Sequence, residues 1–338
     1  MKRISIIMFA NFLLIGALSA QDYHFSQFSN TPLLVNPAFT GVFTGNQRVG
    51  MYYRNQWAGV IASPYKTFGF AFDSKVLKSK NETGALSVGL SLLKDKAGSF
   101  DLSTTQALLS VSYCQAASAS LQFCGGIQGG VSQRTINFTQ EVWDAINDFQ
   151  NTTGTSMGAV PNSLNIEYSH VDLAGGAVIR YSSTGLFNNA NEGVKLNMGA
   201  SFHHVNATEK SFAENDFRSY TKYIFHVNGL IGISSGTFGI SPSFLYVRQG
   251  PHSEILGGAG IRYLFSDNNR MTVQSSESAI SLGAILRYGD SVIPYIQLEY
   301  AHYTVGISYD VCISQLRGMT EQKARGIEIT LGYIFPGK

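Results

Sequence analysis

The residues of this chain that could do hydrolytic chemistry are histidine, serine and aspartate, and the adjacent pair His203 and His204 stands out among them. Neighbouring residues on a strand point to opposite faces of a sheet, so we expect this pair not to share a site. The sequence contains neither a nucleophile elbow nor a base motif at a catalytic spacing. A hydrolase would need a Ser or Asp/His cluster at one rim of the fold. We therefore expect a protein that is not an enzyme.

Metal and thiol chemistry have little support in the sequence. There is no CxxC pair and no histidine-rich ligand set, so we expect no metal and no other cofactor. Two of the three cysteines, Cys114 and Cys124, flank a predicted tight turn at Gln115–Ser120 and would face each other across a hairpin. Two interpretations stay open: a disulfide, which an exported protein permits, or two small apolar side chains.

Apolar and polar residues alternate along most of the chain, so we expect the residues named above to lie on or beside β-strands. In Gly326–Phe335, Ile327 and Leu331 share one face, and Glu328 and Thr330 share the other. The same period predicts about fourteen strands, an even number within the range of bacterial outer-membrane barrels. The sequence thus predicts an all-β fold, a transmembrane up-and-down antiparallel β-barrel whose last strand pairs with its first. The predicted strands are Arg48–Trp57, Lys66–Asp73, Gly84–Leu93, Leu102–Cys114, Leu121–Gln133, Val171–Tyr181, Val194–Val205, Tyr223–Ile233, Phe238–Arg248, Ile255–Phe265, Ala279–Tyr288, Val292–Ala301, Tyr303–Val311 and Gly326–Phe335.

Composition fits a surface that faces lipid. Charged residues make up 14% of the chain, against about 25% in typical soluble domains. No apolar run of about 20 residues follows the N-terminal region, which excludes a helical membrane protein. The formal net charge of +2 is too small to favour a nucleic-acid partner. We expect outer-membrane lipid to surround the protein.

The first twenty residues have the parts of a secretory signal peptide. Lys2 and Arg3 precede the apolar stretch Ile4–Ile15, and small residues follow up to Ala20, where we expect cleavage. The predicted organisation is therefore a signal peptide over residues 1–20, a short pre-barrel segment over 21–45 and an outer-membrane barrel over 46–338.

The pre-barrel segment is rich in apolar residues yet cannot pair as a strand. Pro32 and Pro37 would interrupt a ladder of hydrogen bonds. Its aromatic and aliphatic side chains need apolar contact, so we expect it to fold into or against the periplasmic mouth of the barrel. A flexible tether is the alternative.

Charges of both signs lie on the polar faces of the predicted strands. A wide selective pore tends to carry rings of one sign, whereas mixed signs can pair across a narrow lumen. We therefore favour a filled or plugged barrel over an open porin. These residues are Arg54, Asp73, Asp172, Arg180, Lys195, His203, Lys222, His226, Arg262, Arg287, Glu299, Asp310 and Glu328.

Connection lengths predict the orientation. The long segments Asn137–Glu167, Asn206–Arg218 and Cys312–Arg325 follow odd-numbered strands, whereas the short Gln115–Ser120, Ser234–Gly236 and Ala301-His302 follow even-numbered ones. Ser266–Ser278 also follows an even-numbered strand and is longer than this pattern predicts. Because bacterial barrels have long extracellular loops and short periplasmic turns, we expect odd-numbered connections to face outward. A short helix is expected within the longest loop.

Distinctive motifs lie near the two ends of the chain. They are D-Y-H-F-S-Q-F at Asp22–Phe28, N-P-A-F-T-G at Asn36–Gly41, Y-R-N-Q-W at Tyr53–Trp57, P-Y-K-T-F-G-F-A-F-D at Pro64–Asp73, I-P-Y-I-Q-L-E-Y at Ile293–Tyr300, S-Y-D at Ser308–Asp310 and the closing strand Gly326–Phe335. In these motifs the chain resembles the PorP/SprF family of outer-membrane proteins from Bacteroidetes. Between Asp95 and Arg287 the match is limited to alternating strands.

The resemblance implies a component of the type IX secretion system that supports secretion or surface attachment of particular cargo proteins. Such cargo includes large adhesins recognised through a C-terminal sorting domain, and some members serve gliding motility. Other secretion components are implied partners. Structural roles are expected for the motif residues, with Trp57 as an interface aromatic and Arg54 and Asp73 as lumen partners. These residues are Asn36, Pro37, Gly41, Arg54, Gln56, Trp57, Pro64, Tyr65, Asp73, Tyr309 and Asp310.

Two further classes stay open beside the secretion component, and the hydrolase described above is one of them. An outer-membrane channel or hydrophobic-substrate transporter would also use about fourteen strands. Conductance through the lumen would distinguish it from a filled barrel.

Overall fold

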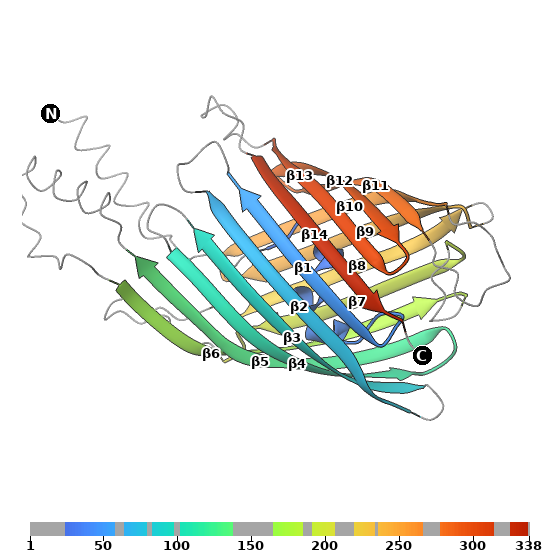
Figure 1. The fold of residues 1–338 in the computed structure, drawn as a ribbon, viewed down its shortest axis with the longest axis horizontal. Coiled ribbons are helices and arrows are strands. Elements are labelled where there is room, and N and C mark those ends of the chain that lie inside the picture. Colours follow the sequence, from blue (N-terminus) through green and yellow to red (C-terminus); the bar gives the residue numbers. More distant parts are fainter. Residues whose placement is uncertain are drawn as a thin grey trace, which may run out of the picture.

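A computed structural model describes residues 24–57, 64–79, 83–97, 102–137, 165–184, 191–206, 220–233, 236–265, 278–313 and 325–336. Fourteen antiparallel strands form a closed barrel in which each strand pairs with its neighbours in the chain and β1 pairs with β14 (Figure 1). The strands are β1 Gln47–Gln56, β2 Tyr65–Lys78, β3 Gly84–Ala97, β4 Leu102–Ala116, β5 Leu121–Asn137, β6 Asn165–Ser182, β7 Val194–His203, β8 Lys222–Ile233, β9 Phe238–Gln249, β10 His252–Leu264, β11 Ala279–Arg287, β12 Ser291–Tyr300, β13 Tyr303–Cys312 and β14 Arg325–Phe335. The predicted fold class and strand number are confirmed.

Closure takes place between the two ends of the chain. Gln47 lies opposite Phe335 and Gln56 lies opposite Gly326, so β1 and β14 pair over the full length of β1. We call the end of the barrel at Gln47 and Phe335 the even rim, because even-numbered strands end there, and the end at Gln56 and Gly326 the odd rim. A closed sheet leaves no unpaired strand edge, which is what a sheet in lipid requires.

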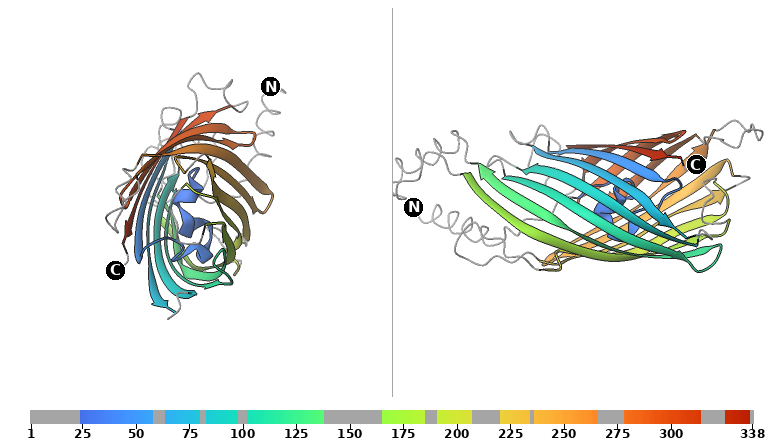
Figure 2. Two further views of the ribbon diagram at one scale, coloured as in Figure 1. Left: turned by 90° about the vertical axis from the view of Figure 1, so that its right-hand side faces the viewer. Right: turned by 60° about the horizontal axis from the view of Figure 1, so that its bottom comes forward.

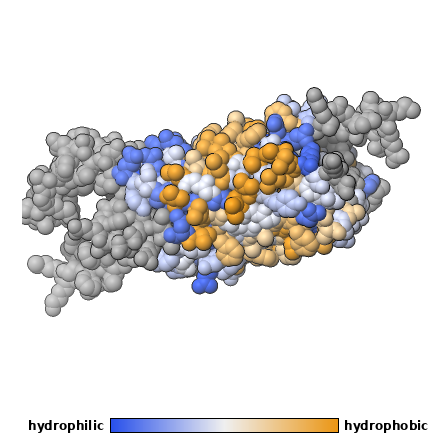
Figure 3. Space-filling view, turned by 90° about the horizontal axis from the view of Figure 1, so that it is seen from below, coloured by the Kyte–Doolittle hydropathy of each residue, from blue (hydrophilic) through white to orange (hydrophobic). Residues whose placement is uncertain are grey.

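Alternation along the strands separates an apolar outside from a polar inside. In β4, Leu109, Val111 and Tyr113 are exposed, whereas Ser110 and Ser112 between them are buried. Figure 3 shows the result on one face of the molecule, where hydrophobic side chains gather in a central band with hydrophilic ones toward both ends. This is the surface of a barrel that spans a membrane. None of the helices among the described residues is long and apolar enough to cross a membrane.

The strand boundaries differ from the prediction most strongly in β5 and β6. The predicted strands stop at Gln133 and start at Val171, whereas the observed ladder continues to the pair Asn137 and Asn165. Polar residues occupy both faces of this extension, so the alternation that identifies a membrane strand is absent from it. These strands extend beyond their neighbours at the odd rim (Figure 1). The helix predicted within 137–167 lies outside the described residues.

The described part of the N-terminal segment, residues 24–46, lies inside the barrel. It forms three short helices, η2 (Phe28–Asn30), α2 (Pro32–Val35) and η3 (Pro37–Phe39), and the view along the barrel in Figure 2 shows them within the ring of strands. We call residues 24–46 the plug. The plug was predicted to lie in or against one mouth, but it follows the lumen between the two rims. His24 contacts Glu254 near the odd rim, and the amide of Asn46 donates to the carbonyl of Phe335 at the even rim.

The orientation of the barrel is testable with single cysteines in two exposed turns. Pro251 lies in the turn at the odd rim between β9 and β10, and Ala119 lies in the turn at the even rim between β4 and β5. We expect a membrane-impermeant maleimide to label Pro251→Cys on intact cells and to label Ala119→Cys only after the outer membrane is permeabilised. The unsubstituted protein gives the background from the native cysteines. The opposite pattern would reverse the orientation.

Candidate functional site: the plugged lumen

One carboxylate on the closing strand holds the first part of the plug. Glu328 is 1% exposed, and its two oxygens accept hydrogen bonds from the backbone amides of Ser26 and Gln27, both at 2.7 Å. The Gln27 side chain also donates to the Ser308 hydroxyl at 3.1 Å. Hydrogen bonds from backbone amides to a buried carboxylate are charge-assisted and stronger than those between neutral groups. β13 and β14 therefore hold the plug near the odd rim.

A network of charges surrounds this attachment. Asp310 contacts Arg54 at 3.2 Å and Arg287 at 3.1 Å, and Arg287 also contacts Glu254 at 2.8 Å. Arg54 donates a second hydrogen bond to the carbonyl of His24 in the plug. The network joins β1, β10, β11 and β13 to the plug, so loss of one member would leave a partner charge buried without compensation.

A second carboxylate holds the last part of the plug. Asp73 is 1% exposed and accepts from the backbone amide of Gly41 at 2.7 Å and from the Arg48 guanidinium at 2.8 and 2.9 Å. Gly41 has a positive φ of 75°, a conformation that glycine adopts without steric cost. Arg54 and Asp73 both lie in the lumen as predicted, but each pairs with a different residue rather than with the other.

Asn36 connects the middle of the plug to the wall. Its Oδ1 accepts from the Ala38 amide at 2.9 Å and so caps η3, which begins at Pro37. Its Nδ2 donates to the carbonyls of Ala177 and Ala200 at 3.1 and 3.0 Å. One side chain thus forms hydrogen bonds with the backbone of the plug, of β6 and of β7.

Two inward glycines leave room for this contact. A Cβ on Gly126 would lie 2.6 Å from the backbone of Pro37 and of Ala38, and a Cβ on Gly176 would overlap Asn36 Oδ1. Both approaches are too close for any side chain. The plug therefore packs directly onto the backbone of β5 and β6.

Apolar clusters fill the lumen around the plug. They place Phe28 and Val35 against Leu256 and Ile293, and Leu33 against wall residues that include Leu93. At 25 cal/mol per Å², burying side chains of this size contributes about 1.5–3 kcal/mol each. The expectation of a filled lumen agrees with this packing.

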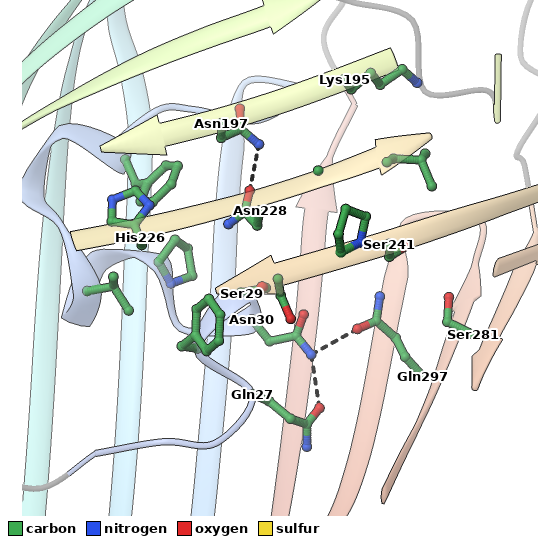
Figure 4. Close-up of a pocket in the computed structure, with 18 of the residues that line it drawn as sticks. Gln27, Ser29, Asn30, Lys195, Asn197, His226, Asn228, Ser241, Ser281 and Gln297 are labelled. Atoms are coloured by element: carbon green, nitrogen blue, oxygen red, sulfur yellow. Dashed lines mark hydrogen bonds between the residues drawn. The ribbon is translucent and has the colours of Figure 1, made fainter. Parts of the chain in front are cut away.

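Cavities remain beside the plug, and two of them exceed 300 Å³. One of about 340 Å³ lies between the plug and the wall from β7 to β12 (Figure 4). At its edge, Asn30 donates to Gln297 at 3.0 Å and to Gln27 at 3.1 Å, and Asn197 donates to Asn228 at 2.8 Å. The other cavity, of about 330 Å³, lies near the odd rim, where the lining residues include His24, Gln56, Trp57, Glu254 and Arg287.

The remaining motif residues lie near the odd rim or on the outer face. Gln56 ends β1, and the next residue, Trp57, has a positive φ of 67°. The Trp57 ring contacts that of Tyr65 edge-on, with centroids 6.4 Å apart. Pro64 directly precedes β2, and Tyr309 is exposed on the outer face of β13. Asn36 and Gly41 belong to the plug, and Arg54, Asp73 and Asp310 of the wall contact it. Pro64 and Tyr309 lie away from the plug.

The prediction that His203 and His204 cannot share a site was wrong. β7 ends at His203, whose ring faces inward by the regular alternation of the strand. His204 has a positive φ of 57°, which breaks this alternation, so its ring is buried on the same side. His204 Nδ1 lies 2.9 Å from Asp172 Oδ1, and His203 Nε2 lies 3.2 Å from the carbonyl of Val35 in the plug. The cavity that both histidines line measures about 10 Å³, which is the size of one water molecule rather than of a substrate.

The structure decides between the two interpretations of Cys114 and Cys124. Cys114 and Cys124 form a disulfide between β4 and β5 and lie against Ala38 and Phe39 of the plug. Cys312 is buried on β13. Within the described part of the chain, no group of three His, Cys, Asp or Glu side chains is arranged to hold a metal ion.

The charged residues of the site that the sequence analysis missed include Arg48 and Glu254. Arg48 shares the inward face of β1 with Gly50 and Arg54, so the period of two was a sufficient signal. Glu254 was excluded because the tenth strand was predicted to begin at Ile255, whereas it begins at His252.

A closed sheet with an apolar outside and a filled, charge-paired inside defines a transmembrane β-barrel of the outer-membrane type that carries an internal plug. The model of the family described as type IX secretion system membrane protein PorP/SprF matches residues 17–333, and the chain belongs to this family. Comparison with curated protein sequences gives no match.

Among solved structures, the chain is similar to the toluene transporter TbuX of Ralstonia pickettii, with a TM-score of 0.50 and 10% identity over 90% of this chain and 94% of that one. The toluene transporter TodX of Pseudomonas putida gives 0.49 and 10% over 93% and 94%. The translocator domain of the autotransporter NalP from Neisseria meningitidis gives 0.42 and 11% over 92% and 96%. At these identities the likeness concerns the fold alone.

The contact between plug and wall is testable with two adjacent glycines. We expect Gly126→Ala to displace η3, because the new methyl group would collide with plug backbone, and to lower the free energy of unfolding by about 1–3 kcal/mol. The folded fraction at each denaturant concentration can be measured on gels of unboiled samples, because the folded barrel and the unfolded chain migrate as separate bands. Protease should also release the N-terminal segment from this variant faster than from the unsubstituted protein.

Gly125→Ala is the matched control. Gly125 faces outward, and a Cβ there meets no atom within 4 Å, so stability and protease resistance should be unchanged. Equal behaviour of the two variants would contradict the packing of the plug against β5.

Proposed function

We propose that this protein is an outer-membrane component of the type IX secretion system that supports the secretion or cell-surface attachment of a small set of cargo proteins. Adhesins with a C-terminal sorting domain are the expected cargo, and gliding motility is one process that such cargo could serve. The observation that carries the proposal is membership of the PorP/SprF family over residues 17–333. Export through a signal peptide at residues 1–20 belongs to the same proposal, and those residues lie outside the described ones.

The plugged lumen supports a role in binding rather than in passage. Glu328 and Asp73 hold the plug at two levels, and apolar clusters fill the space between it and the wall. A folded cargo protein could not pass through this space. We therefore assign contact with cargo and with other secretion components to the rims of the barrel.

The outward loops are the expected place of cargo contact. The longest of them, residues 138–164, lies outside the described residues, but the strands that carry it, β5 and β6, extend beyond their neighbours at the odd rim. No catalytic role is assigned, because the small cavity at His203 and His204 has no room for a substrate.

A deletion strain tests the proposal. We expect loss of this protein to abolish surface display of a few cargo proteins and to spare general secretion, because the family handles particular clients. Proteomics of shaved cell surfaces and of culture medium measures both, and a strain that carries the gene in trans is the control. An unchanged cargo profile together with lost uptake of a small solute would instead favour a channel or hydrophobic-substrate transporter.

A further inference from the structure

A β-bulge places two lysines of β2 on the same, lumen-facing side of the strand at the even rim. Lys75 and Lys78 are three residues apart, which in a regular strand would place them on opposite faces. The register between β2 and β3 shifts after Lys75, so that Lys75 lies opposite Ser87 and Lys78 opposite Ala85, two positions apart on one face. Bulges of this kind redirect side chains, often beside functional sites.

Both lysines reach neutral oxygens of the plug. Lys75 Nζ donates to the carbonyl of Phe43 at 2.5 Å and lies over its ring, 4.9 Å from the centroid. Lys78 Nζ donates to the side-chain oxygen of Asn46 at 2.6 Å. Each ammonium group has three hydrogens, so donors remain for a further acceptor.

A third cation completes the cluster. Arg180 on β6 donates from Nη1 to Gln122 at 2.7 Å and from Nε to Asn197 at 3.3 Å, and these acceptors are also neutral. Lys75, Lys78 and Arg180 line one cavity of about 240 Å³, and none of its lining residues among those described is a carboxylate. Asp73 is the nearby buried carboxylate, and it already pairs with Arg48 and accepts a hydrogen bond from the amide of Gly41.

The electrostatics of this cavity favour an anion. Three positive charges around one space repel one another, and an anion between them adds an attractive interaction with each charge that offsets this repulsion. The guanidinium fork and two ammonium groups suit a phosphate group, which carries more charge and more oxygens than a carboxylate. Lys78 is exposed, so the cavity can be reached from the even rim.

We propose that the even rim carries a binding site for a phosphate group, held by Lys75, Lys78 and Arg180. The group comes either from free phosphate or from the headgroup of a phospholipid, and the two sources share this recognition chemistry. The site is separate from the rim loops to which cargo contact is assigned and does not depend on that role.

Inorganic phosphate is the probe for the first arm of the test. The full-length protein, folded in detergent at constant ionic strength, is titrated with phosphate and with acetate by calorimetry. We expect one phosphate to bind per chain and to bind more tightly than acetate. Lys75→Gln and Lys78→Gln should each weaken phosphate binding about tenfold, since each removes a charge-assisted hydrogen bond.

Lys94→Gln is the matched control, because it removes one lysine from the outer side of β3 near the odd rim and should leave binding unchanged. Lys78→Gln changes an exposed side chain, so its barrel should show the same band shift on heating as the unsubstituted protein. Phosphate affinity that is equal in all variants, or acetate binding as tight as phosphate binding, would overturn the proposal.

Native mass spectrometry distinguishes the two sources. A lipid headgroup predicts one phospholipid that stays bound to the protein purified from membranes and is lost from Lys75→Gln and Lys78→Gln. Free phosphate predicts no retained lipid but the same calorimetric result. A phospholipid that both variants retain, without phosphate binding, would also overturn the site.

Discussion

The structure depends on how the charges inside a closed sheet find partners. Glu328 and Asp73 point into the lumen, and each accepts backbone amide hydrogens from the plug, near opposite ends of that segment. A buried carboxylate without such partners would be strongly unfavourable. Arg48 pairs with Asp73, and Arg54, which lies opposite Glu328 in the ladder, pairs with Asp310. The plug is therefore part of the fold of the barrel rather than an appendage, and the wall and plug are expected to fold as one unit.

Because the interior is filled, we expect the protein to bind its partners at the two rims. Near the odd rim, Asp310 and Arg287 belong to a network of buried ion pairs. At the even rim, Lys75, Lys78 and Arg180 surround an accessible cavity. A shared barrel fold does not distinguish a transporter from a secretion component, because the same sheet supports both. Family membership favours the secretion role.

Alternation along the chain was enough to predict fourteen strands, their closure and an inward face of mixed charge, because each of these follows from a period of two. Which charges meet could not be predicted in the same way. Arg54 and Asp310 lie on β1 and β13, which are not neighbours, and meet beside the plug with β14 between their strands. The bulge beside Lys75 and the positive φ of His204 are single-residue departures from alternation, and the sequence carries no periodic signal for either.

Single-channel recording in planar lipid bilayers tests the plugged lumen most directly. The unsubstituted protein should insert without a steady open conductance, and a variant that lacks residues 21–45 should conduct, because the space that the plug occupies would then hold water. A steady, large conductance of the unsubstituted protein, equal to that of the deletion variant, would contradict the account of a lumen closed by its own N-terminal segment.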